Sequence, residues 1–405
     1  MSASNNMYTF SKRGKNITYA LLGIGIVSTV IGCFTGCGDS HVQTARFWSN
    51  LLVNGFFFFA IGLGALFFLA LQYATEAGWG TVLKRVFEAV ASFLPIGAGV
   101  LIIVFACGSF HVHHLYHWMS EGVMDPKSPE YDHIIADKGA YLNQPFFWVR
   151  TLVYLGVYMI FLMAFRKRSA QEDLEGGTKI HFINYKRGAL FLVFFAVFSS
   201  TQSWDWIMSL DTHWYSTLFG WYTFAGMWVS AIIVFIMITL YLKSKSMLEN
   251  VNESHLHDLG KWMFAISFLW SYLFFFQYML IWYANIPEEV TYYQFRYENY
   301  KTIYWIMFII NFSLPMVILM SRDAKRNPKI LILIGSVIFI GHWLDVFVMV
   351  MPATMFQNWQ FGAMEIGMFL AFLGLFIHVV LRALSSRPLS VKNHPYLEES
   401  IHHNT

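Results

Sequence analysis

The sequence predicts an all-α integral membrane protein of about ten transmembrane helices. Of its 405 residues, 57% are hydrophobic and only 13% are charged, whereas a soluble domain carries roughly 25% charged residues. Ten apolar stretches approach or exceed the roughly 20 residues that a helix needs to cross a hydrocarbon core of about 30 Å. Lys and Arg also concentrate in alternate loops, as expected of a chain that crosses a membrane repeatedly.

The apolar stretches define the predicted spans, which lie at about 17–36, 51–74, 87–110, 146–165, 188–210, 215–241, 260–285, 303–320, 329–351 and 362–383. Pro95, Pro315 and Gly-rich pieces such as Gly62–Leu63–Gly64 are expected to interrupt some spans. Such breaks are tolerated in membranes where neighbouring helices satisfy the freed backbone groups. No soluble domain is evident between the spans. We therefore expect residues 1–405 to form a single polytopic membrane domain.

The basic residues predict the orientation of these spans. With ten spans, 21 of the 27 Lys and Arg residues fall on the side of the N-terminus. Only six fall on the opposite side, namely Arg46, Lys127, Lys138, Arg150, Arg296 and Lys301. Because positive charge is retained in the cytoplasm, the sequence predicts an even number of spans with both termini cytoplasmic.

Cofactor-binding patterns are missing from the sequence. The three cysteines form no CxxC or CxxCH pattern, which argues against an iron–sulfur cluster or a covalent haem. The predicted spans contain only His342 and His378, near opposite sides, which argues against a transmembrane b-type haem. The net charge of +3 comes from the loops, so nucleic acid is not an expected partner.

A group of four histidines follows the third span. If this segment is helical, His113 and His117 share one face, which would suit zinc or copper. No Cys or acidic residue stands at close ligand spacing, so ordinary loop histidines are favoured and no metal is expected. The full group is His111, His113, His114 and His117.

Ionisable residues at membrane depth are costly and tend to face the protein interior, water or a partner. Several are predicted near the outer side, where they could form a buried polar cluster that exchanges protons. The alternative is that these carboxylates cap helices or pair with Arg150 and Arg296. The outer candidates are Asp205, His342, Asp345 and Glu365 in the spans, and Asp211, His213, His111 and His113 beside them.

On the cytoplasmic side the main candidate is Glu88, in the first turns of the third span. It could belong to a proton pathway together with the outer candidates Asp205, His342, Asp345 and Glu365. It could equally pair with Lys84, one turn earlier on the same helix face.

Three motifs closely resemble the NrfD-like membrane subunits of bacterial alternative complex III, a quinol:electron-acceptor oxidoreductase. They are SWDWIMSLDTHWYST at 203–217, QYMLIWYANIPEE at 277–289 and GHWLD at 341–345. The first two are the more diagnostic, and the likeness extends over essentially the whole chain, including the helix count.

The resemblance implies two four-helix bundles, at about 51–210 and 215–351, flanked by helices at about 17–36 and 362–383. It also implies a bacterial inner membrane protein that contacts lipids and binds no redox cofactor itself, and it leaves open whether the chain contacts quinol or quinone. Its expected partners are a second NrfD-like subunit and periplasmic subunits that carry iron–sulfur clusters and c-type haems. The outer loops 111–145 and 284–301 are the expected contact regions. In length, this chain is most similar to the shorter of the two NrfD-like subunits.

Three functions remain open at the level of the sequence. The first is a structural, proton-conducting subunit of such a complex, and the second is its quinol-oxidising subunit. The third is a stand-alone secondary transporter, which often has ten or twelve spans with broken helices near the midplane. The ionisable residues of this chain gather at the outer edge instead, which favours the first two.

Overall fold

The computed structural model describes residues 7–35 and 40–404, and these residues form helices without any strand. Ten helical segments in this part of the chain are long and apolar enough to cross a membrane. The predicted all-α class and the predicted number of candidate spans are therefore confirmed.

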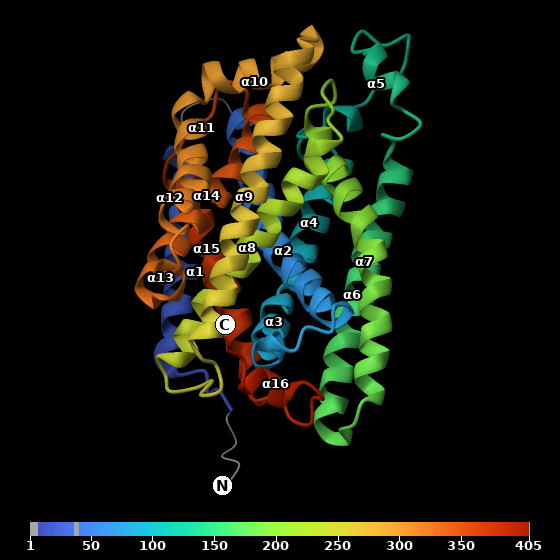
Figure 1. The fold of residues 1–405 in the computed structure, drawn as a ribbon. Coiled ribbons are helices and arrows are strands. Elements are labelled where there is room, and N and C mark those ends of the chain that lie inside the picture. Colours follow the sequence, from blue (N-terminus) through green and yellow to red (C-terminus); the bar gives the residue numbers. More distant parts are fainter. Residues whose placement is uncertain (1–6, 36–39, 405) are drawn as a thin grey trace.

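The ten segments follow one another along the chain (Figure 1). They are α1 (Lys12–Thr35), α2 (Ser40–Ala74), η1 (Trp79–Leu83) with α3 (Lys84–Ala91) and α4 (Leu94–Ser109), α6 (Gln144–Glu175), α7 (Lys179–Trp206) with η3 (Met208–Leu210), α8 (Leu218–Lys243), α9 (Glu253–Ala284), α11 (Lys301–Phe308) with η4 (Ile309–Ser313) and α12 (Leu314–Ile318), α14 (Pro328–Met355) and α15 (Ala363–Leu384). Shorter helices connect them, namely η2 (His117–Met119), α5 (His133–Asp137), α10 (Pro287–Asn299), α13 (Arg322–Arg326) and α16 (Leu397–Ile401).

Several helices extend beyond the apolar stretches that predicted them. Helix α2 begins at Ser40 although its apolar stretch begins near residue 51, and α6 ends at Glu175 although its apolar stretch ends near residue 165. The added turns carry polar residues such as Arg46 and Glu172, which are buried against partners from other helices. Hydropathy alone therefore underestimates the helix length, because it does not register charges that are paired inside the protein.

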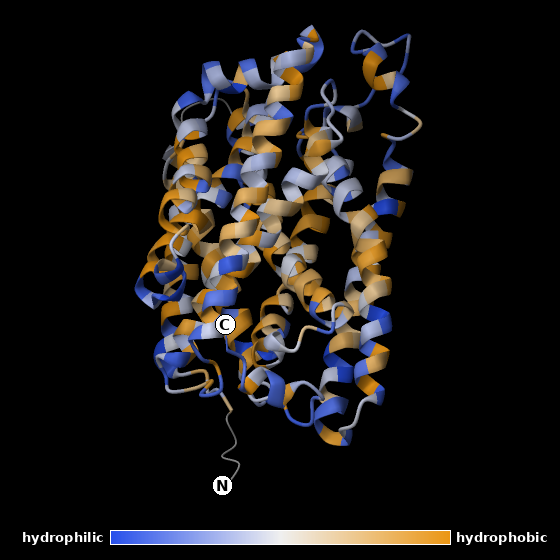
Figure 2. Ribbon diagram, viewed as in Figure 1, coloured by the Kyte–Doolittle hydropathy of each residue, from blue (hydrophilic) through white to orange (hydrophobic). Residues whose placement is uncertain are grey.

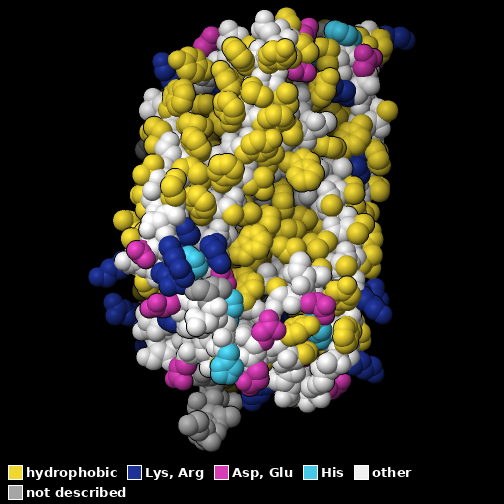
Figure 3. Space-filling model, in the orientation of Figure 1, with side chains coloured by type: hydrophobic (Ala, Val, Ile, Leu, Met, Phe, Trp, Pro, Cys, Tyr) yellow, Lys and Arg dark blue, Asp and Glu magenta, His cyan; other side chains and the backbone are white. Residues whose placement is uncertain are grey.

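The two ends of the molecule differ in charge. We call them the α10 end, which carries α5 and α10, and the terminal end, which carries the start of α1 and helix α16 (Figure 1). Apolar residues dominate the length between them (Figure 2). In the space-filling view most Lys and Arg side chains lie toward the terminal end (Figure 3), as expected for the cytoplasmic side of a membrane protein.

Helix α2 is the centre of the packing, since 94% of the residues in its most apolar stretch are buried inside the protein. It contacts α3, α4, α7, α8, α14 and α15. Helix α1 lies outside this core and packs along α15, where Gly25 and Gly32 allow close approach. A Cβ atom at Gly32 would lie 2.6 Å from the backbone nitrogen of Met364, so the contact requires glycine.

The spans that contain Pro95 and Pro315 are irregular, as the sequence predicts. The interruption predicted at Gly62–Leu63–Gly64 is wrong, because α2 is continuous there and its glycines serve close packing, Gly62 against Leu94 and Gly64 against Met227. Pro95 stands in the first turn of α4, after a break that separates it from α3. Pro315 stands in the first turn of α12, directly after the π-helix η4. This π-helix faces α14 where Gly341 lies, and a Cβ atom there would clash with Asn311 of η4. Single-turn π-helices are often found beside functional sites.

Candidate functional site

Asp345 on α14 is a buried carboxylate that receives hydrogen bonds from neutral donors. Its side chain is 2% exposed. The Tyr222 hydroxyl of α8 donates to Oδ1, and the Trp270 indole N–H of α9 donates to Oδ2 at 2.9 Å. Within 7–35 and 40–404, no Lys or Arg nitrogen lies within 4.0 Å of this carboxylate. Among the described residues, Asp345 is therefore held by neutral hydrogen-bond donors and not by a Lys or Arg ion pair.

His342 lies one turn before Asp345 on the same helix. Its Nδ1 is 3.8 Å from Asp345 Oδ2, and both side chains are 2% exposed. Neither ring nitrogen of His342 has a hydrogen-bond partner among the described residues, and the ring packs edge-on against Trp270. Histidine beside a carboxylate is a common proton-exchanging pair. The sequence predicted this pair, and the structure brings the two side chains together.

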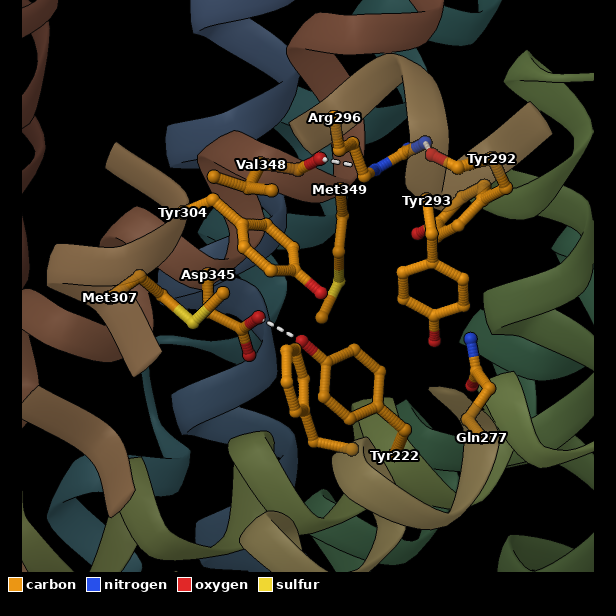
Figure 4. A pocket seen from close by; sticks show the side chains of 11 residues that line it. Tyr222, Gln277, Tyr292, Tyr293, Arg296, Tyr304, Met307, Asp345, Val348 and Met349 are labelled. Atoms are coloured by element: carbon orange, nitrogen blue, oxygen red, sulfur yellow. Dashed lines mark hydrogen bonds between the residues drawn. The ribbon is translucent and has the colours of Figure 1, made fainter. Parts of the chain in front are cut away.

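A small pocket lies beside Asp345 (Figure 4). It encloses about 310 Å³ of atom-free space, including its open mouth. The enclosed part has room for a water molecule, which needs two to four polar partners in such a place. Its lining is rich in hydroxyl groups and comes from α8, α9, α10, α11 and α14. The lining residues are Tyr222, Phe274, Gln277, Tyr292, Tyr293, Arg296, Tyr304, Met307, Asp345, Val348 and Met349.

Arg296 of α10 lies on the opposite wall of this pocket. It is only 3% exposed, and it donates hydrogen bonds to the carbonyl oxygens of Val348 and Tyr292. Its guanidinium carbon lies 3.3 Å from the centre of the Tyr292 ring, and Trp214 stacks on the other face of that ring. In the described chain no carboxylate oxygen lies within 4.0 Å of Arg296. A buried cation and a buried anion thus line one pocket without pairing.

Burial raises the pKa values of Tyr292 and Tyr293 above the ordinary value of tyrosine. Both phenols therefore stay protonated at neutral pH and act as neutral hydrogen-bonding groups. Together with the Tyr222 hydroxyl, they line the pocket with polar groups that carry no charge.

An aromatic groove adjoins the pocket on the outside of the helix bundle. It encloses about 1,220 Å³, including open space, and shares Phe274, Tyr293 and Tyr304 with the pocket. Its other residues are Phe275, Tyr278, Ile281, Trp282, Val290, Gln294, Tyr297, Trp305 and Phe308. Trp282 is 66% exposed and Phe275 is 55% exposed, so the groove opens toward the surroundings of the protein, where lipid would lie.

The other predicted carboxylates of the α10 end are neutralised by arginines. Asp205 of α7 accepts two hydrogen bonds of 2.8 Å from Arg150 and one of 3.0 Å from Tyr154. Glu365 of α15 accepts bonds of 2.8 and 2.6 Å from Arg46. Both carboxylates are therefore in structural ion pairs, the alternative considered from the sequence. Asp205 pairs with Arg150, as that alternative predicted, whereas the partner of Glu365 was not predicted.

The outer polar residues do not form one cluster. His213 is half exposed and lies 2.6 Å from Asp132, whereas buried His113 bonds to the Val104 carbonyl and packs on Trp48. Helix α4 ends at Ser109 and η2 begins at His117. The shared helix face considered for His113 and His117 is therefore wrong, because the segment between these elements is not helical.

A second outer cavity collects the remaining members of the predicted cluster. It encloses about 1,120 Å³, including open space, and is lined by His114, His117, Asp211 and His213 together with Arg296. His111 lies apart from it, half exposed, 3.9 Å from Glu121. Asp211 and His213 thus share a cavity at the α10 end, and this cavity has Tyr292 and Arg296 in common with the pocket of Asp345.

Glu88 belongs to an ion-pair network at the terminal end. Its Oε2 accepts a bond of 2.8 Å from Arg85, which also bonds to Asp173, and Arg387 lies 3.8 Å away. The pairing proposed with Lys84 is wrong, since Lys84 instead donates to Glu172 at 2.5 Å. Glu88 thus pairs with Arg85, three residues earlier on its own helix, because Lys84 turns to Glu172 of α6.

Sequence reasoning missed a buried histidine pair at the same end. His181 begins α7 and His394 lies in the C-terminal segment, and their rings are 5.4 Å apart beside Glu172. Burial lowers the pKa of His394 to about 3, and the Lys84 ammonium and the His181 ring act in the same direction. His394 is therefore neutral at pH 7. The only signal in the sequence was that His394 closely follows the basic residues of the C-terminal region.

The three motifs of the sequence meet at the α10 end. The first contributes Asp205 and Trp214, the second contributes Gln277 to the pocket and Trp282 to the groove, and the third contributes Asp345. Neither a family model nor a curated protein sequence matches this chain. The resemblance to NrfD-like subunits therefore depends on these motifs and on the helix count.

Proposed function

We propose that this chain is a membrane subunit of a quinol:electron-acceptor oxidoreductase related to alternative complex III, in which it handles protons. The supporting observation is Asp345, a buried carboxylate that lies beside His342 and a water-sized pocket without an Arg or Lys partner in the described residues. Groups of this kind can take up and release protons at membrane depth. The most similar member of that complex is the shorter of its two NrfD-like subunits, designated ActF.

The helix contacts support the proposed arrangement in two four-helix bundles. In the first half, α2 contacts α4, α4 contacts α6, and α6 contacts α7. In the second half, α8 contacts α9, α9 contacts η4, and α14 contacts both α11 and η4. Helices α1 and α15 pack mainly on each other. This corresponds to bundles at about 51–210 and 215–351 with two flanking helices.

In the proposed mechanism Asp345 is the proton acceptor of the pocket. A proton that arrives from the α10 end passes to Oδ1 or Oδ2, while Tyr222 and Trp270 keep the carboxylate in place through their hydrogen bonds. His342 offers a second acceptor 3.8 Å away. The positive charge of Arg296 on the far wall stabilises the negative charge of any acidic group that enters the pocket.

The aromatic groove favours a second candidate, the quinol-handling subunit of the same complex. A quinol has a flat ring and an apolar tail, which suit a groove lined by Tyr278, Trp282 and Trp305. Quinol oxidation releases protons and needs an acceptor near the ring. The groove shares Tyr293 and Tyr304 with the pocket of Asp345, which places such an acceptor nearby.

The first test identifies the assembly. The chain is purified with a C-terminal tag in mild detergent, and the subunits and the reduced-minus-oxidised visible spectrum are recorded. Co-purified haem c and iron–sulfur subunits, with haem reduction by added quinol, would support the respiratory complex. A lone, colourless chain in several mild detergents would refute it and favour a stand-alone transporter.

The second test separates proton handling from quinol oxidation. In vesicles that contain the complex, Asp345→Asn should lower the protons translocated per electron, because asparagine keeps the shape of the side chain but takes up no proton at this pH. The matched control is Asp137→Asn on exposed α5, which should leave the ratio unchanged. Loss of electron transfer itself would favour the quinol-handling role, and an unchanged ratio and rate would refute both roles for Asp345.

A further inference from the structure

The terminal end contains a group of side chains that have the composition of a metal site. One ligand atom each from Glu172, His181 and His394 lies within 4.8 Å of the other two, and all three side chains are buried. They come from the last turns of α6, the first turn of α7 and the C-terminal segment. Two histidines and one glutamate form a known three-ligand set for zinc, with the fourth position left to water.

The chain folds so that these three residues meet. Helices α6 and α7 are joined by a tight turn in which Gly176 and Gly177 have positive φ angles of 65° and 73°. This turn places Glu172 opposite His181. The C-terminal segment is then fixed to α6, because the Lys392 N–H and the Asn393 side chain both bond to Asp173, and this brings His394 to the same place.

Two of the ligand atoms are buried acceptors that have no hydrogen-bond partner in the described structure. They are Oε1 of Glu172 and Nδ1 of His181. The other nitrogen of His181, Nε2, lies 3.3 Å from Oε1 of Glu76 and bonds to it. A carboxylate on one ring nitrogen fixes the tautomer and presents the opposite nitrogen as a lone pair, the usual arrangement around a metal-bound histidine. Leaving two buried acceptors without a partner costs free energy that a cation would recover.

We infer that Glu172, His181 and His394 bind a divalent transition-metal ion of the zinc class, which fastens the C-terminal segment to the α6–α7 turn. This site is independent of the function proposed above and lies at the opposite end of the molecule.

The distances allow coordination after small movements. With bonds of about 2.1 Å, the ligands of a tetrahedral zinc ion lie about 3.4 Å apart, so three atoms within 4.8 Å must approach by roughly 1 Å. Rotation of the side chains and a shift of the C-terminal segment supply this. Coordination through Nε2 of His394 also moves its ring proton to Nδ1. Nδ1 then no longer accepts the hydrogen bond of 3.2 Å from the Tyr396 N–H. That loss is about 1 kcal/mol.

Lys84 is the main opposing charge. It bonds to Oε2 of Glu172 at 2.5 Å and leaves Oε1 free. With Glu76 and Glu172 ionised and Lys84 protonated, the three groups sum to one negative charge, and the neutral imidazole of His394 adds none. A divalent cation is therefore electrostatically acceptable in this place.

The test counts zinc on the full chain in the assembly in which it purifies. The protein is freed of metal with a chelator, incubated with micromolar Zn²⁺, passed through a desalting column and analysed for bound zinc. The variants His181→Gln and His394→Gln are compared with His402→Gln, since His402 lies in the same C-terminal segment but its side chain is 79% exposed. We expect one more zinc ion per chain in the wild type and in His402→Gln than in the other two variants.

A second measurement is hydrogen exchange of residues 388–396 with and without Zn²⁺. Zinc should slow exchange there at least tenfold in the wild type and in His402→Gln, and should have no effect in His181→Gln. His181→Gln does not alter the C-terminal segment itself. If the substitution nevertheless unfolded this segment, exchange of residues 388–396 would already be faster than in the wild type without zinc. Equal zinc content in all four proteins, or exchange insensitive to zinc in the wild type, would overturn the inference.

Discussion

The contrast between Asp205 and Asp345 can be tested through stability. Both carboxylates are buried, but Asp205 forms a two-bond ion pair with Arg150 whereas Asp345 is held by Tyr222 and Trp270. Asp205→Asn removes the charge that neutralises Arg150 and turns an amide group toward its guanidinium. Removing one partner of a buried pair costs about 3–5 kcal/mol.

We expect the lower end of this range, about 3 kcal/mol, because the Arg150 side chain keeps 10% exposure and its guanidinium packs on Tyr141 and Phe146 at 3.9 and 4.1 Å. In Asp345→Asn, the amide oxygen still accepts from Trp270 and the amide nitrogen donates to the oxygen of Tyr222. Both hydrogen bonds persist, so the expected cost is about 1 kcal/mol or less.

The assay is unfolding of the wild type and the two variants in one detergent, titrated with dodecyl sulfate and followed by tryptophan fluorescence. The predicted gap of about 2 kcal/mol is a roughly 30-fold difference in the unfolding equilibrium. The double variant Arg150→Gln with Asp205→Asn should be more stable than the sum of the two single changes predicts, by at least about 1 kcal/mol. If both Asp variants lose the same stability, or if the double variant shows no coupling, the distinction between a paired and an unpaired carboxylate is refuted.

Two further predictions concern packing and pH. Gly341→Ala should destabilise the protein by about 1–3 kcal/mol, because its Cβ atom would clash with Asn311 in the π-helix. The control in the same unfolding titration is Gly99→Ala, which has open space at the Cβ position and should be neutral or slightly stabilising. The C-terminal segment should detach more readily as the pH falls below about 6.5, because the folded state holds His394 neutral with a pKa of about 3 while the released segment takes up a proton. Between pH 7.5 and 5.5 the free energy of docking should fall by about 1 kcal/mol, measured by metal-free hydrogen exchange corrected for intrinsic rates. His394→Gln should flatten this dependence, and an equally steep dependence in that variant would exclude His394 as its source.

The sequence predicted well the properties that depend on neighbouring residues. An apolar run such as 329–351 predicts a span by its own length, and α14 is found at Pro328–Met355. It also placed His342 and Asp345 in the same outer group, and the structure brings them within 3.8 Å. Pro95 and Pro315 were expected to interrupt their spans, and a break precedes Pro95 while a π-helix precedes Pro315. Pro352, by contrast, lies inside the unbroken helix α14.

The sequence failed where two distant segments decide the outcome. Helical spacing offered Lys84 as a partner for Glu88, but Lys84 bonds to Glu172 of α6, and Glu88 pairs with Arg85, three residues earlier on its own helix. The histidines near residue 113 were considered as one helix face, but the helix ends at Ser109. Nothing in the local pattern near His394 indicates that it meets His181 in the folded chain.

By itself the sequence determined that this is a helical membrane protein with ten spans, and it predicted their orientation, because hydrophobic length and basic charge are read along the chain. Only the tertiary structure decided which buried acid pairs with an arginine and which is held by neutral donors. Arg46 reaches Glu365 across 319 residues of sequence, and Arg150 reaches Asp205 across 55. The cost of burying a charge depends on the nearest opposite charge, and that neighbour is set by helix packing.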